Sequence, residues 1–262
     1  MYVKSCVLMA CMLVSNACVQ VPGTGRSQLN LVSDAQIRSL GDQTYRELLS
    51  DQSVIRVGSD VERLQKMPQR IIRSAEVLYP QTTADLTWEI VLIDDPTPNA
   101  FALPGGQIGM HTGMVELAES DDAIAIVIGH EVAHVIAAHA AERFSQQVLI
   151  GASLALGSEA LGDQDEDTRA VIMGVLGVGG TLGVALPYSR LHESEADELG
   201  LMIAANAGYD PRAAIPLWRR MEESSSGQLE FLSTHPVPET RINDFRRIMP
   251  QAMRLYRRAK RS

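Results

Sequence analysis

The sequence has little cysteine, and none of it lies in the body of the chain. Its 262 residues include three cysteines, Cys6, Cys11 and Cys18, so the residues after 18 offer no disulfide, no thiolate nucleophile and no cysteine-rich zinc site. Aromatic residues make up only 5% of the chain, and the formal net charge is −9. A base-stacking platform and a phosphate-binding surface are therefore not expected, and no nucleic-acid partner is predicted.

The remaining composition is that of a globular protein. Hydrophobic residues make up 45% of the chain and charged residues 21%, which suits one generous domain with a sizeable core. The chain contains no internal repeat and no obvious boundary between domains. We therefore predict a single domain over residues 34–262.

The first residues have the layout of an export signal. Lys4 gives a positive start, an apolar run covers residues 7–14, and Ser15 and Ala17 are small residues three and one positions before Cys18. We expect residues 1–17 to be this signal, residues 18–33 to be a tether, and the protein to be exported to the periplasm.

A cysteine at the cleavage point also resembles a lipoprotein box. Cys18 would then carry acyl chains and anchor the protein, as a lipoprotein, to a membrane of a Gram-negative bacterium. An uncleaved apolar N-terminus is the alternative, although the run is shorter than the ~20 residues that span a bilayer.

The pattern of apolar residues predicts a mainly helical α+β protein with one small sheet. β-Branched and aromatic residues over 86–93 predict a strand, and Pro104-Gly105-Gly106 between two short apolar arms predicts a hairpin over 99–111. Helices are expected over residues 34–49 and 121–144, capped by Ser33 and Ser120, over 60–78 with an interruption or kink near Pro68, and over 189–207, 211–224 and 238–260.

An apolar segment over residues 171–186 is rich in glycine. No strand precedes it and its glycine spacing is not that of a dinucleotide-binding loop. We predict a close-packed helix hairpin, with a lid or a membrane-touching element as the alternative.

The clearest chemical motif is His130-Glu131-Val132-Ala133-His134. On a helix the two histidines lie one turn apart on the same face, close enough for both imidazoles to bind one metal ion. Glu131 is offset by about 100°, so it can stand beside the metal and accept a proton from water. Burying these groups without a partner would cost several kcal/mol. We therefore predict a zinc site with an open position for hydrolysis.

A carboxylate from a later helix is the best candidate for the third zinc ligand. Glu193 and Asp197 are four residues apart, so one helix face presents both carboxylates. Glu193 could bind zinc while Asp197 orients a ligating imidazole. His192 is the alternative ligand.

Two neighbouring residues are given lesser roles. His139 lies about 140° around the helix from His134, so we expect it at the surface or in a second layer. Glu195 points away from Glu193, and we expect it to be solvated or paired with Arg190.

At four places the sequence resembles a family of zinc metallopeptidases. The matching segments are Asn99–Gly106, His130–His134, Glu193–Asp197, and Ser233–Pro236 with Arg241. The family includes HtpX, the type I CAAX prenyl proteases, the mitochondrial Oma-type proteases and the periplasmic BepA and LoiP proteins. The resemblance covers roughly residues 34 to 250. It implies a zincin-type (gluzincin) domain, mainly helical, with a small β-sheet and an edge hairpin.

The resemblance also implies roles for individual residues. His130, His134 and Glu193 would bind one zinc ion per chain, Glu131 would be the general base, and Asp197 would support the ligands from a second layer.

A further pair of residues matches the family near its active site. His235 and Arg241 would stabilise the oxyanion of the tetrahedral intermediate by donating hydrogen bonds where charge develops. In BepA-like members the matching histidine can also cap the zinc ion and keep the enzyme latent.

The hairpin is the natural place for a substrate. Zincins bind substrates as an extra strand along a sheet edge, and Asn99, Ala100, Phe101 and Ala102 form that edge here. Backbone pairing gives little selectivity, which is typical of a quality-control protease. We therefore predict a cell-envelope endopeptidase that cleaves unfolded or misassembled envelope polypeptides, with the envelope assembly machinery as a potential partner. A latent, chaperone-like or assembly-factor lipoprotein is the alternative.

Overall fold

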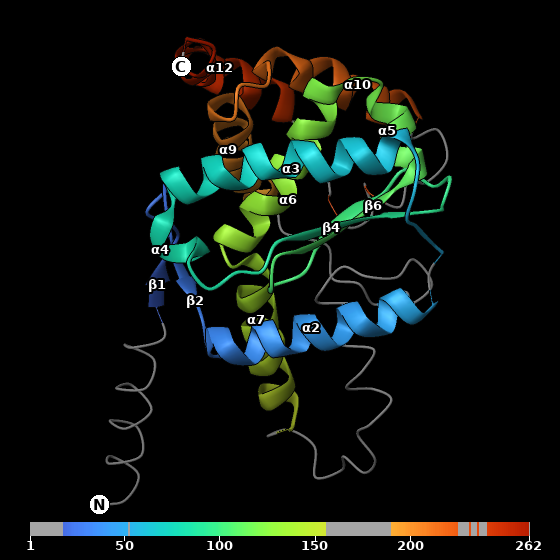
Figure 1. Cartoon of the computed structure of the whole chain (residues 1–262). Helices are drawn as coiled ribbons and strands as arrows, with labels where there is room; N and C mark the ends of the chain where they lie inside the picture. The colour runs from blue at the N-terminus through green and yellow to red at the C-terminus, as the bar shows by residue number, and fades with distance from the viewer. Residues whose placement is uncertain are drawn as a thin grey trace, which may run out of the picture.

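The computed structural model describes residues 18–51, 53–155, 190–224, 231, 235 and 240–261. The expectations for residues 1–17 and 171–186 lie outside these residues. Within them the protein is mainly helical with small sheets, so the predicted α+β class is confirmed (Figure 1). The elements are β1 (Cys18–Gln20), β2 (Ser27–Leu29), α2 (Asp34–Asp51), β3 (Val54–Ile55), α3 (Ser59–Leu78), α4 (Pro80–Thr83), β4 (Glu89–Ile93), β5 (Ala100–Ala102), β6 (Gln107–His111), α5 (Thr112–Ala118), α6 (Asp121–Ile136), α7 (His139–Ala155), α9 (Arg190–Asn206), the 3₁₀ helix η1 (Pro211–Ala213), α10 (Ala214–Ser224) and α12 (Arg241–Ala259).

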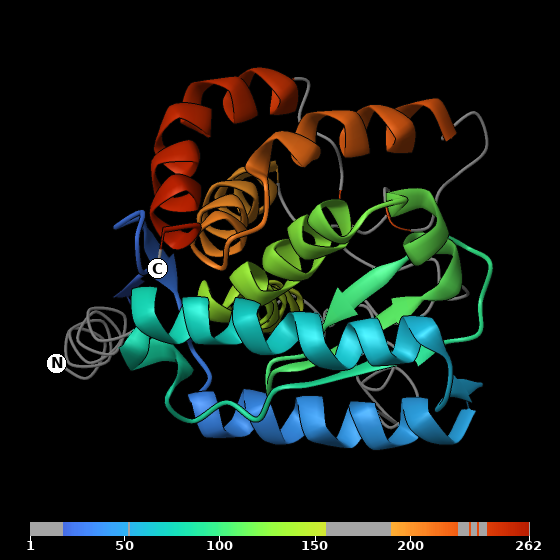
Figure 2. The same ribbon diagram turned by 45° about the horizontal axis from the view of Figure 1, so that its top comes forward.

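Helices α6 and α9 cross in the interior with their backbones in contact, between α3 on one side and α12 on the other (Figure 2). A Cβ added to Gly129 would lie 2.7 Å from the carbonyl oxygen of Gly200. A Cβ added to Gly200 would lie 2.7 Å from backbone atoms of Gly129 and His130. A side chain at either glycine would therefore push the two helices apart. This close crossing places the residues that follow Gly129 against the middle of α9.

The main sheet has the strand order β3–β4–β6–β5, with β4 parallel to β6 and the other pairs antiparallel. Successive side chains of a strand point to opposite faces. Ala100 and Ala102 therefore join the core with α3, α6 and α9, whereas Phe101 packs with Tyr45 and Leu48 of α2. Figure 1 shows α3 and α2 on opposite sides of β4 and β6.

The predicted hairpin is confirmed. β5 and β6 are antiparallel, with Ala100 opposite Met110 and Ala102 opposite Ile108. Gly106 turns the chain with a φ of 101°, a left-handed conformation that favours glycine. β5 lies at the edge of the sheet.

Several predicted helix features are also present. Ser33 and Ser120 each accept a hydrogen bond, at 3.2 Å, from the backbone N–H three residues later. Helix α3 runs from Ser59 to Leu78 without a break. The predicted interruption at Pro68 is therefore absent, because this buried proline packs into the core and tertiary contacts offset the hydrogen bond that it cannot donate.

The single helix expected over residues 121–144 is wrong. Helix α6 ends at Ile136, and α7 starts at His139 after a bend of 51°. Ala138 lies between them in the left-handed region, with a φ of 53°. This bend turns His139 back toward the end of α6.

The segment expected to be a tether contains regular structure. β1 and β2 form an antiparallel hairpin next to α4 (Figure 1). Val21 is buried in the core, and the Cα of Gly23 is so close to α9 that an added Cβ would lie 2.7 Å from the Leu199 side chain. The hairpin is therefore packed against α9.

No single helix among the described residues is long and apolar enough to cross a membrane. The bent pair formed by α6 and residues 139–147 meets the criteria of length and composition.

Candidate metal centre

Two histidines of α6 form the floor of the site. His130 and His134 are one turn apart, and their Nε2 atoms are 3.0 Å from each other. Both side chains are almost completely buried. The predicted convergence of the two imidazoles on one point is therefore present.

Helix α9 brings two carboxylates to these histidines. The Glu193 oxygens lie 3.4 Å from His130 Nε2 and 3.4 Å from His134 Nε2. One turn later, Asp197 Oδ1 accepts a hydrogen bond from His130 Nδ1 at 3.0 Å. The Gly129–Gly200 contact explains this arrangement, since it holds the two helices at backbone distance directly beside these side chains.

His235 joins the cluster from the C-terminal part of the chain. Its Nδ1 lies 3.0 Å from Glu193 Oε1 and 3.3 Å from His130 Nε2. Its ring stacks on Phe231, with 4.4 Å between the ring centroids. The ring is thus held with Nδ1 toward the donor cluster.

Arg241, at the start of α12, bonds to both carboxylates. Its Nε and Nη2 donate to Asp197 at 2.5 and 2.8 Å, and Nη2 also donates to Glu193 at 3.1 Å. The guanidinium lies over the Trp218 ring, 3.4 Å from its centroid. Its Nη1 is buried and has no hydrogen-bond partner among the described residues.

The donor set fits a zinc ion. Ligand atoms of His130, His134, Glu193 and His235 all lie within 4.8 Å of one another, and all four side chains are buried. Imidazole nitrogen and carboxylate oxygen are the usual ligands of catalytic zinc. Around the cluster, the carboxylates outnumber the guanidinium of Arg241, so a cation is favoured there.

The pKa values of the clustered residues reflect the same preference for a positive charge. Burial lowers the pKa of His130, but hydrogen bonds to Asp197 and Glu193 outweigh burial and raise it to about 9. Burial lowers the pKa of His134 well below its usual value. Burial raises the pKa of Glu193, but the neighbouring histidines, His235 foremost, hold it well below its usual value. The carboxylate of Glu193 therefore stays ionised and favours a positive charge beside it.

Glu131 stands beside the cluster without belonging to it. Its Oε1 is buried, accepts no hydrogen bond from the described residues, and lies 3.8 Å from His235 Nε2. Burial raises its pKa, and electrostatic interactions with His235 and His130 oppose that increase. The position matches the predicted role of a base beside a metal ion.

The edge strand lies next to this carboxylate. Burial raises the pKa of Glu131, and a hydrogen bond from the backbone of Ala102 opposes part of that increase. Asn99, Ala100, Phe101 and Ala102 are all buried, and Asn99 Oδ1 has no hydrogen-bond partner among the described residues. The structure thus brings the expected substrate edge next to Glu131.

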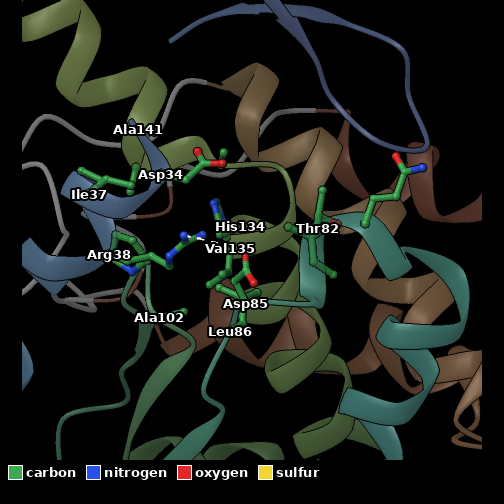
Figure 3. A pocket seen from close by; sticks show the side chains of 15 residues that line it. Asp34, Ile37, Arg38, Thr82, Asp85, Leu86, Ala102, His134, Val135 and Ala141 are labelled. Carbon is green, nitrogen blue, oxygen red and sulfur yellow. Dashed lines mark ion pairs between the residues drawn. The ribbon is translucent and has the colours of Figure 1, made fainter. Parts of the chain in front are cut away.

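A cavity of about 140 Å³ opens between the edge strand and His134 (Figure 3). Arg38 of α2 and Asp85 face each other across it, 3.9 Å apart. Ala102 and Pro104 line the side of the hairpin. The cavity therefore connects the end of the edge strand to a residue of the donor cluster.

Two expectations about the neighbouring residues need correction, and a third is met in one of its two alternatives. His139 is in a second layer rather than at the surface: it is fully buried, and its Nδ1 lies 2.9 Å from His134 Nδ1, because the bend after α6 turns it inward. Glu195 is buried and bonds to His139 and Arg26 rather than being solvated or paired with Arg190. His192 is not in the donor cluster; its Nε2 lies 2.9 Å from a carboxylate of α7. No local pattern in the sequence could have indicated the part played by Arg26.

Two imidazoles from one helix and a carboxylate from a crossing helix are the arrangement of the HExxH class of zinc peptidases. The chain belongs to peptidase family M48, whose model matches residues 59–249. The resemblance expected from the four motifs is therefore confirmed.

Individual relatives agree with this assignment. The chain is 32% identical over 235 residues to the mitochondrial metalloendopeptidase OMA1 of Schizosaccharomyces pombe, covering 88% of this chain and 66% of the relative. It is 30% identical over 250 residues to the mitochondrial metalloendopeptidase OMA1 of Homo sapiens, covering 89% and 46%. It is 24% identical over 233 residues to the beta-barrel assembly-enhancing protease of Yersinia pestis, covering 86% and 46%. The chain thus spans about half to two thirds of the length of these relatives.

Proposed function

We propose that this chain is a zinc-dependent endopeptidase of the cell envelope that cleaves unfolded or misassembled polypeptides. The observation that carries the proposal is the buried cluster of His130, His134 and Glu193 with Glu131 beside it. A purely structural zinc site would close its coordination with protein ligands. It would not need a buried carboxylate whose Oε1 faces the site and accepts no hydrogen bond from the part of the chain that the structure describes.

The residues of the cluster divide the chemistry. Zinc held by His130, His134 and Glu193 would polarise the scissile carbonyl group and lower the pKa of water. Glu131 accepts the proton of the attacking water at Oε1 and passes it to the leaving amine. Burial raises the pKa of Glu131 and so increases its basicity. Asp197 keeps the proton of His130 on Nδ1, which directs the Nε2 lone pair into the cluster.

His235 and Arg241 supply the hydrogen bonds that developing negative charge requires. His235 Nε2 faces Glu131, whereas its Nδ1 contacts Glu193. Arg241 uses Nε and Nη2 to hold the carboxylates, which leaves its buried Nη1 for the oxyanion.

Latency is the second candidate, and one observation favours it. His235 Nδ1 lies in the donor cluster, 3.3 Å from His130 Nε2. A fourth protein ligand in this position would occupy the place that the substrate needs. In that state the protein would act as a zinc-bound assembly factor with little proteolysis.

The substrate would add a strand to β5. This strand is at the edge of the sheet, and its last residue, Ala102, lies beside Glu131. Main-chain hydrogen bonds along such an edge accept many sequences, which suits a protease of unfolded chains. The cavity next to His134 offers space for a substrate side chain.

The proposed location rests on the N-terminal sequence. Residues 1–17 have the layout of an export signal, and Cys18 would carry the lipid. A Cys18→Ser variant should move from the membrane to the soluble periplasmic fraction of a Gram-negative cell. An unchanged distribution would contradict lipid anchoring and leave the peptidase proposal intact.

Casein cleavage tests the activity. The purified protein should cleave casein, and both Glu131→Gln and a zinc chelator should abolish cleavage. Glu116→Gln, which changes an exposed glutamate of α5, is the matched control and should retain activity. Zinc binding without cleavage by the wild-type protein would contradict the proposed endopeptidase activity.

A His235→Ala variant separates the two candidates. Increased cleavage would support latency through His235, because the substitution would open a coordination position. Decreased cleavage with zinc still bound would support a hydrogen-bonding role at the oxyanion.

A further inference from the structure

We propose that the N-terminal hairpin is part of the metal centre. Arg26, which precedes β2, is a positioning residue that acts through Glu195 and His139 to orient the zinc ligand His134. The inference rests on the proposed function, because it takes His134 as a zinc ligand.

The relay is the series of contacts from His134 through His139 and Glu195 to Arg26. Its first contact joins two histidines. His134 directs Nε2 into the donor cluster, so binding zinc there requires its ring proton on Nδ1. His139 Nδ1 lies 2.9 Å from His134 Nδ1. His139 therefore accepts this proton's hydrogen bond and carries its own proton on Nε2. That Nε2 donates to Glu195 Oε2 at 3.1 Å.

The second step fixes the carboxylate that receives this hydrogen bond. Arg26 Nε donates to Glu195 Oε2 at 2.9 Å, and the Thr24 hydroxyl donates to Oε1. The other two nitrogens of Arg26 donate to Glu142, at 3.0 and 2.7 Å. One guanidinium thus joins Glu142 on α7 to Glu195 on α9, with both carboxylates almost fully buried.

A third contact holds the His139 ring itself. The His192 ring stacks on His139, with 4.4 Å between centroids and 24° between planes. His192 Nε2 lies 2.9 Å from Glu142 Oε2, the oxygen that Arg26 also contacts. Arg26 therefore supports His139 twice, through the acceptor of its Nε2–H and through the ring stacked on its face.

This geometry gives the hairpin a role that a tether does not have. Arg26 lies 116 residues from Glu142 and 169 residues from Glu195 in the sequence. Its guanidinium contacts both carboxylates. Orientation of a ligating imidazole through its second nitrogen commonly changes metal affinity by about 10- to 100-fold.

The test compares zinc affinity in four single variants and one double variant of the full chain. His139→Phe removes the acceptor for His134, Arg26→Met removes the guanidinium, and His139→Asn retains an oxygen near the position of Nδ1. Arg63→Met is the matched control, because Arg63 also bridges two carboxylates, Asp60 and Asp121, but at the surface. Competition with a chromophoric chelator gives the zinc dissociation constant, and the visible absorption of bound Co²⁺ reports the ligand geometry.

We expect His139→Phe and Arg26→Met to weaken zinc binding about tenfold or more and to shift the Co²⁺ bands. His139→Asn should recover much of the affinity, which a general loss of packing would not allow. Arg26→Met should add little in the His139→Phe background, since both act along one path. Far-UV circular dichroism identifies a variant that does not fold, and Arg26→Lys, which keeps the charge without the fork, then takes its place.

Two results would overturn the inference. One is zinc affinity in Arg26→Met and His139→Phe equal to that of Arg63→Met. The other is full additivity of Arg26→Met and His139→Phe. Failure of the wild-type chain to bind zinc is a different result, and it would overturn the proposed function itself.

Discussion

The two histidines of α6 are held from behind in different ways. His130 bonds directly to the carboxylate of Asp197, which Arg241 grips in turn. His134 bonds to a second imidazole, His139, and His139 in turn bonds to the carboxylate of Glu195. The first support lies within the crossing of α6, α9 and α12, whereas the second extends to the N-terminal hairpin.

The difference between the two supports is one of charge. The carboxylates raise the pKa of His130 to about 9, whereas burial lowers the pKas of His134 and His139, the latter to about 4. In the metal-free protein His130 is thus placed where positive charge is favoured, whereas His134 is neutral. The side of His130 and Asp197 therefore attracts the metal ion, and the side of His134 and His139 sets the orientation of a ligand.

The largest expected effect is on the charged side. Arg241→Met leaves the buried carboxylates of Glu193 and Asp197 without their guanidinium, and should lower the free energy of unfolding of the metal-free protein by about 3–5 kcal/mol. Urea unfolding in the presence of a chelator measures it. Arg63→Met, at an exposed ion pair, should cost less than about 1 kcal/mol. Equal losses of unfolding free energy in Arg241→Met and Arg63→Met would contradict the special role of the buried guanidinium.

The next effect compares the supports directly. Asp197→Asn should weaken zinc binding toward about 100-fold and His139→Phe toward about tenfold, because a hydrogen bond to a charged partner is about twice as strong as a neutral one. Chelator competition measures both constants. The reverse order would show that geometry outweighs charge at this site.

The next prediction concerns the helix crossing, which positions the α9 carboxylates behind both His130 and His134. Gly200→Ala places a methyl group 2.7 Å from the backbone of α6 and should cost about 1–3 kcal/mol of unfolding free energy. It should also weaken zinc binding, because Glu193 and Asp197 would move away from His130. Thermal unfolding and the same chelator assay test it, and unchanged zinc affinity would contradict the importance of the helix crossing.

The smallest expected effect is the pH dependence of stability that Glu142 causes, on the side of the site that supports His134. Burial raises the pKa of Glu142, but hydrogen bonds with His192 and Arg26 outweigh burial and hold it at about 2, below its usual 4.5. The folded state therefore binds this proton more weakly than the unfolded state, so the stabilisation is complete above pH 4.5 and is lost as the pH falls toward 2. The unfolding free energies of the wild type and Glu142→Gln should converge over that range. A constant difference between them would contradict this account.

The sequence predicted the parts of the site that are local in the chain. His130 and His134, and Glu193 and Asp197, are each one helical turn apart, so spacing alone places each pair on one face. His235 and Arg241 needed the family resemblance, because no helical spacing relates them to the other four. The hairpin with its glycine turn was also visible, since its turn residues have specific conformational preferences.

The relay behind His134 could not be predicted for two physical reasons. The bend after α6 depends on Ala138 in a left-handed conformation, which alanine rarely adopts and which carries no sequence signal. A straight helix would have carried His139 away from His134. The contacts of Arg26 also depend on how the hairpin docks, and that is decided by tertiary packing of residues such as Val21.

The glycine contact between α6 and α9 also bears on how the metal is acquired. With no side chain at the crossing, the separation of the two helices is set by backbone alone, and no rotamer change can widen or narrow it. Folding of the chain therefore brings the donor atoms together before the ion binds. Zinc would bind a preformed site, and a chelator should remove it without unfolding the protein.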